Sequence, residues 1–203
     1  MLIRRGALAL LTLALLALVT PAYATVMVEI PIEELIASSD AIVHAHVLRT
    51  GAQLETFEGH LEAHTIAELR IDEWLRGTGG ERALIDEIGG TVEGNGSWID
   101  GTPRYRDGEE VVVFLRRLPS GAHRTVGMEQ GRFDVVHTVT ASGARTVVER
   151  DTSTLAFAAW VNGAMQVRDG ALSPAVDYDS FVGFVTSVVE QLAADARTTG
   201  GAR

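Results

Sequence analysis

Four of the six histidines fall in two short patterns that could hold a metal ion. His44-x-His46 and His60-x-Glu62-x-His64 place ligand-type side chains at every second residue. Residues two apart on a β-strand share one face and lie about 7 Å apart at the backbone, so two imidazoles can reach one ion. Zinc and copper both accept imidazole nitrogen. The spacing predicts a zinc or copper site built from His44, His46, His60 and His64.

The two patterns form one site only if their strands pair in a suitable register. A hairpin that turns near residue 54 would bring His44 opposite His64 and His46 opposite Glu62. A slip of one residue would move one set to the other face. The alternative interpretation is a solvent-facing sheet surface on which histidine and glutamate are ordinary residues.

Several other chemistries lack the residues that they need. The chain has no cysteine, and all 17 basic residues are arginine, which excludes thiol nucleophiles, iron–sulfur clusters, P-loop lysines and Schiff bases. No Gly-x-Ser-x-Gly elbow is present. The adjacent carboxylates Asp86-Glu87 and Glu109-Glu110 should point to opposite faces of a strand. We therefore assign no catalytic residue, and a metal-dependent hydrolase stays an alternative.

The hydrophobic pattern predicts a mainly β fold, between all-β and α+β. Long alternation over His60–Ile71 is typical of an antiparallel sheet or a small barrel. A short helix is expected over Pro31–Ser38, and an amphipathic helix from residue 177 to Arg197. The further strands expected are Ala41–Leu48, Glu81–Ile88, Glu110–Arg116, His123–Gly127, Arg132–Thr138 and Arg145–Arg150.

The first 24 residues predict export. Arg4 and Arg5 precede the apolar run Ala7–Val19, and Ala22-Tyr23-Ala24 is a small-x-small cleavage site. The protein is therefore expected in the periplasm or the extracellular medium, with cleavage near Ala24. The rest divides into a β-barrel domain at 25–176, a helix packed on it at 177–197 and a disordered tail at 198–203.

Charge and hydropathy limit the partners. The formal net charge is −10, which disfavours nucleic acid. Beyond the signal peptide, no apolar run reaches the ~18 residues that a membrane span needs, so an integral membrane protein is not expected. The partners left are another exported protein or a small ligand.

The order of the strand motifs resembles a known fold. Ser38–Val47, then Trp74-Leu75-Arg76-Gly77, then Gly108–Leu115 and Gly131–Val135 follow one another as in the OB-like barrels of netrin and metalloproteinase-inhibitor-type domains. Exported bacterial proteins with the same layout and no assigned activity are more similar still. The resemblance implies a small antiparallel barrel. It carries no inhibitory residue across, because the eukaryotic inhibitors act through an amino-terminal cysteine.

We expect an exported, non-catalytic binding module that uses one barrel face and the turn-rich loop 89–108. Trp98 and Tyr105 lie in this loop and would supply rigid contact area. The alternatives are the metal-binding protein or metal-dependent hydrolase described above, and a proteinase inhibitor.

Overall fold

The computed structural model describes residues 26–57, 59–140 and 143–200. The predicted signal peptide, residues 1–24, lies outside them. The described chain is mainly β with two α-helices, which confirms the predicted class. Neither helix within these ranges has an apolar stretch that could cross a bilayer.

Most of the expected elements are present, and the first two long strands extend further than predicted. The helices are α2 (Ile32–Ser38), the 3-10 helix η1 (Met128–Gly131) and α3 (Tyr178–Gly200). Helix α3 therefore includes residues 198–200, which the sequence assigned to a tail. The strands are β1 (Val26–Met27), β2 (Ala41–Phe57), β3 (His60–Arg76), β4 (Arg82–Ile88), β5 (Gly90–Val92), β6 (Asn95–Ser97), β7 (Glu110–Arg117), β8 (His123–Thr125), β9 (Arg132–Thr140), β10 (Gly143–Glu149), β11 (Ala156–Val161), β12 (Ala164–Asp169) and β13 (Val176–Asp177).

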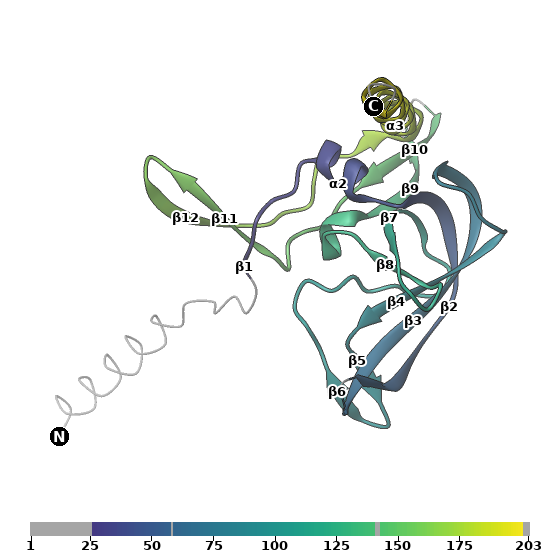
Figure 1. Cartoon of the computed structure of the whole chain (residues 1–203), viewed down its shortest axis with the longest axis vertical. Coiled ribbons are helices and arrows are strands. Elements are labelled where there is room, and N and C mark those ends of the chain that lie inside the picture. Colours follow the sequence, from purple (N-terminus) through teal and green to yellow (C-terminus); the bar gives the residue numbers. More distant parts are fainter. Residues whose placement is uncertain (1–25, 58, 141–142, 201–203) are drawn as a thin grey trace.

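The largest sheet has the order β13-β10-β9-β7-β2-β3-β4-β8 (Figure 1). Strand β8 pairs with β4 at one side and with β7 at the other, so the pairings of five strands return to their starting point. The β4–β8 pairing is parallel and the other neighbours in this sheet are antiparallel.

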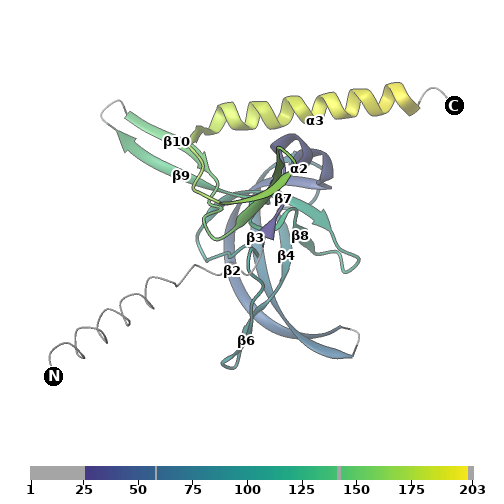
Figure 2. The ribbon, with the colours of Figure 1, turned by 90° about the vertical axis from the view of Figure 1, so that its left-hand side faces the viewer.

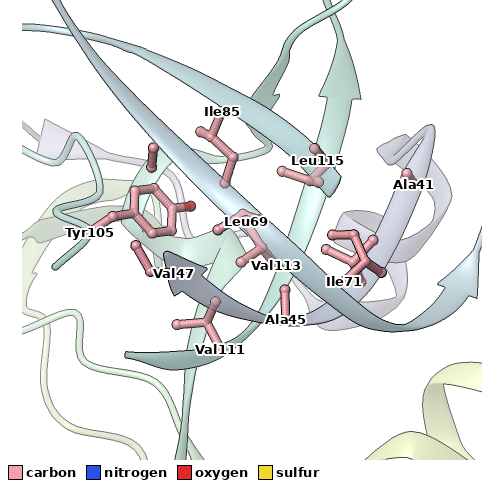
Figure 3. Packing of buried hydrophobic residues seen from close by; sticks show 13 residues of the cluster. Ala41, Ala45, Val47, Leu69, Ile71, Ile85, Tyr105, Val111, Val113 and Leu115 are labelled. Atoms are coloured by element: carbon pink, nitrogen blue, oxygen red, sulfur yellow. The ribbon is translucent and has the colours of Figure 1, made fainter. Parts of the chain in front are cut away.

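Alternate residues of these strands meet in an inner core. Val43, Ala45 and Val47 are buried on one face of β2, as their alternation predicts. Figure 3 shows aliphatic side chains of β2, β3, β4 and β7 packed together there, with the ring of Tyr105 at one side of the cluster. The β-branched residues fit this half of the sheet because they pack closely on a pleated surface.

A second core lies on the other face of β7 and is covered by helices α2 and α3 (Figure 2). Phe114, Phe133 and Phe181 stack in series, with ring centroids 5.4 and 5.0 Å apart. Burial of Phe181 and Val185 holds the first half of α3 against the sheet. The start of α3 is thereby placed beside the polar outer edge of β2 and β7.

Strands β11 and β12 form a hairpin that projects from the rest of the molecule, with β1 alongside (Figure 1). The hydrophobic pattern predicts no strand in either segment. Trp160 opposes Met165 near its end, and their exposed fractions are 77% and 62%.

Candidate functional site

The β2–β3 hairpin decides where the candidate histidines lie. Phe57 pairs with His60, so the turn falls between these residues and not near residue 54. Gly59 has φ +84°, a backbone conformation that a tight turn requires and that glycine adopts without strain. His44 consequently opposes Glu73, and His64 opposes Gln53.

The predicted patch of four histidines is therefore wrong. The longer hairpin moves His44 and His46 to one half of the strand pair and His64 to the other. His60 is exposed beside the turn and lies apart from the other three histidines. The two patterns give two separate clusters in place of one site.

The first cluster consists of Glu55, His64 and Asp86. One ligand atom from each lies within 4.8 Å of the other two, and no other group of histidine and acidic residues in the described ranges meets this condition. His64 Nδ1 is 2.6 Å from Asp86 Oδ1 and 4.0 Å from Glu55 Oε2. His64 and Asp86 are buried, whereas Glu55 is half-buried. We call this cluster the groove centre.

A bulge in β2 makes this arrangement possible. The register of β2 against β3 shifts between Val47 and Arg49, so odd-numbered residues face inward before the shift and outward after it. Glu55 therefore shares the outer face with His64. The two are diagonal neighbours across the strand pair, because Glu55 directly opposes Glu62.

Glu55, Asp86 and Glu68 all line a groove of about 850 Å³. The Glu68 carboxylate receives Arg49 Nε and Arg82 Nη1, each at 2.6 Å. Hydrogen bonds from Arg49 and then Arg82 hold the pKa of Glu68 below its usual range. Each guanidinium is largely exposed and keeps further N–H donors available to a ligand.

The second cluster surrounds Glu110, the first residue of β7. Its carboxylate lies 2.8 Å from His44 Nε2, 2.6 Å from His137 Nε2 and 3.4 Å from His46 Nε2. Burial acts to raise the pKa of Glu110, but hydrogen bonds from His137 and His44 outweigh it and lower the pKa. We call these four residues the histidine array.

Sequence reasoning missed Glu110 and His137 as members of this array. Strand β2 supplies two histidines, β7 supplies Glu110 and β9 supplies His137. The pairing of His46 with Glu110 and the β7–β9 ladder bring them together. No local pattern could indicate this, since 64 residues separate His46 from Glu110.

The two aromatic residues of the loop 89–108, Trp98 and Tyr105, lie in different environments. Tyr105 is only 5% exposed and its hydroxyl lies 2.6 Å from Thr125 Oγ1, so it belongs to the inner core. The expected role of Tyr105 in contacting a partner is therefore corrected. Trp98 is 38% exposed, and the Arg104 guanidinium lies 4.1 Å from its ring centroid. Trp98 lines a second cavity of about 340 Å³.

Comparison with protein-family models, curated proteins and solved structures finds no match for this chain.

Proposed function

We propose that this protein is an exported, non-catalytic binding module that holds a divalent metal ion at Glu55, His64 and Asp86. The observation that carries the proposal is the close approach of three ligand atoms, two of them on residues that line a groove of about 850 Å³. A buried carboxylate is costly unless it is paired, and a cation would add to the partners that Asp86 already has. These partners are His64 Nδ1 at 2.6 Å and Arg124 Nη2 at 3.6 Å from Asp86 Oδ1.

The donor set indicates which ions fit. Two carboxylates and one imidazole suit manganese or zinc better than the softer copper(I). Three protein ligands leave coordination positions open. These positions would face the groove, since Glu55 and Asp86 line it. The alternative of a metal-dependent hydrolase would use the same open positions.

The groove suggests the class of ligand that would join the ion. Arg49 and Arg82 present planar guanidinium groups that match carboxylate and phosphate. A small anionic ligand would therefore contact the metal at one end and these arginines further along. The closed set of strand pairings supports an OB-like barrel as the scaffold, and such barrels commonly bind ligands on a strand face.

The test is manganese binding to tag-free protein after treatment with a chelator. We expect one Mn²⁺ per chain by calorimetry and electron paramagnetic resonance. His64→Ala and Asp86→Asn should each weaken binding by about 10-fold or more, because each removes a ligand. Glu81→Gln, an exposed acidic residue just before β4, is the matched control. Absence of Mn²⁺ and Zn²⁺ binding at this centre, or equal affinity in all variants, would overturn the proposal.

Trp98 supports a second candidate function, contact with another exported protein through the loop 89–108. Its half-exposed indole is held by Arg104 beside a cavity, and such anchored aromatic residues often dominate interfaces. Trp98→Ala should leave the melting temperature unchanged if the ring serves only a partner. A large loss of stability would assign the ring to the fold.

A further inference from the structure

Three histidines of the histidine array direct the same ring atom at one carboxylate. Nε2 of His44, His46 and His137 lies 2.8, 3.4 and 2.6 Å from the oxygens of Glu110. Zinc and copper(II) both bind imidazole nitrogen and carboxylate oxygen, and the array offers three imidazoles and one carboxylate. The array is separate from the groove centre, because it lies at the other half of the β2–β3 hairpin.

The opposite nitrogen of each ring, Nδ1, has its own partner outside the array. Metal-binding histidines usually have such a partner, which fixes the ring orientation and the tautomer. The partners and their distances from Nδ1 are Tyr178 Oη at 2.9 Å for His44, Asp72 Oδ2 at 2.6 Å for His46, and Thr146 Oγ1 at 3.1 Å for His137.

The tautomer of His46 decides what lies between its Nε2 and Glu110. An ionised Asp72 can only accept a hydrogen bond, so its contact at 2.6 Å fits a proton on His46 Nδ1. Arg70 Nη2 can only donate, so its contact at 2.9 Å from the same nitrogen fits the other tautomer. With the proton on Nδ1, His46 Nε2 directs a lone pair at a Glu110 oxygen, and a metal ion or a further proton between the two atoms would satisfy both.

The separation of these two acceptors fits a shared metal ion. Two ligand atoms at 2.0–2.2 Å from one zinc at a tetrahedral angle lie about 3.4 Å apart. His46 Nε2 and Glu110 Oε2 are 3.4 Å apart. The other two contacts are hydrogen bonds, at 2.8 and 2.6 Å, and would lengthen as the ion replaces their protons.

We propose that His44, His46, His137 and Glu110 form a second metal site, for Zn²⁺ or Cu²⁺. Binding requires side-chain rotation, because no three of these four residues bring one ligand atom each within 4.8 Å of one another. The ring centroids of His44 and His46 are 6.3 Å apart, whereas two imidazoles on one zinc lie about 5 Å apart. His137, with 62% of its side chain exposed, has room to move. Four protein ligands would complete a tetrahedral zinc site.

The experiment is copper and zinc titration of tag-free, chelator-treated protein. We expect the protein to bind one equivalent of Cu²⁺ at this site. The electron paramagnetic resonance spectrum of the bound ion should show coupling to several imidazole nitrogens. His46→Ala and His137→Ala should each weaken this equivalent by about 10- to 100-fold, since each removes a ligand. Circular dichroism checks that each variant folds. His137→Ala is the variant least able to perturb the fold, because His137 is exposed.

Two control variants separate this site from the groove centre. His60→Ala removes an exposed strand histidine outside both clusters and should change nothing. His64→Ala should abolish the Mn²⁺ site and leave the nitrogen-rich Cu²⁺ signal intact. The proposal is overturned if Cu²⁺ and Zn²⁺ affinities are the same in His46→Ala, His137→Ala and wild type. It is also overturned if His64→Ala removes the imidazole-coupled signal.

Discussion

Two histidine–aspartate pairs of equal length lie in different halves of the β2–β3 hairpin. His64 Nδ1–Asp86 Oδ1 and His46 Nδ1–Asp72 Oδ2 both measure 2.6 Å. The first pair has side chains 9% and 11% exposed, and the second 33% and 23%. Equal distances do not imply equal energies, because burial removes the water that would compensate for a lost partner.

The pairs also differ in what lies beyond the histidine. The other ring nitrogen of His64, Nε2, lies 3.9 Å from the half-buried Glu62. The corresponding nitrogen of His46 faces Glu110, which two further histidines contact. In the groove centre, the pair serves as a buried anchor beside an open groove. In the array, the aspartate orients one ring among three.

The largest expected effect is on stability. Asp86→Ala should lower the free energy of unfolding by about 2–3 kcal/mol, because it leaves His64 buried without its partner. Asp72→Ala should cost less than about 1 kcal/mol, since water can replace a partly exposed partner. Urea denaturation of both metal-free variants measures the difference. Equal costs would show that burial does not distinguish the pairs.

The next effect concerns Glu87, which follows Asp86 on β4 but points inward and is 3% exposed. Burial raises the pKa of Glu87 from 4.5 to about 7. The folded state then binds more protons than the unfolded state between these values, so stability falls as pH rises through them. Glu87→Gln should remove this loss, a gain on the order of 2–3 kcal/mol at pH 8 relative to pH 4. Urea denaturation at a series of pH values measures this. The prediction is contradicted if the free energy of unfolding changes with pH by the same amount in the variant and the wild type.

A smaller effect is expected from Tyr178, which packs against the second core and places its hydroxyl at the array. Its hydroxyl lies 2.9 Å from His44 Nδ1, and burial raises its pKa to about 12, so it stays protonated. Tyr178→Phe should weaken Cu²⁺ or Zn²⁺ binding by about 10-fold through looser orientation of His44. Mn²⁺ affinity at the groove centre should not change. Calorimetry with each metal measures the affinity of the array and that of the groove centre. Equal losses of affinity at both would show that the two clusters do not bind metal independently.

The smallest effect concerns Glu110. Its contribution to stability depends on pH in the opposite direction from that of Glu87. The pKa of Glu110 is lowered in the folded state, so its stabilising contribution is present above the unfolded value and disappears as pH falls through the folded value. Metal-free Glu110→Gln should cost about 1 kcal/mol at pH 7. Thermal unfolding at pH 7 and pH 3 should show the difference vanish at the lower pH. A difference that persists at pH 3 would refute an ionic role.

Much of the fold follows from local patterns. Alternation at Val43, Ala45 and Val47 predicts the inner face of β2, and Phe181 and Val185 predict the buried side of α3. The hairpin at β11–β12 escapes such reasoning, because β12 and the second half of β11 are exposed on both faces and give no amphipathic pattern. Its course is set by contacts with β1 at the base.

The candidate sites show where local reasoning ends. Spacing alone places His44 and His46 on one strand face. The β-strand repeat of two residues fixes that much without any tertiary contact. The partners were decided by register. One turn between Phe57 and His60, and one bulge after Val47, put Glu55 beside His64. The separate register of β2 against β7 put His46 opposite Glu110. Register depends on how the whole sheet buries its apolar faces, so only the folded chain determines it.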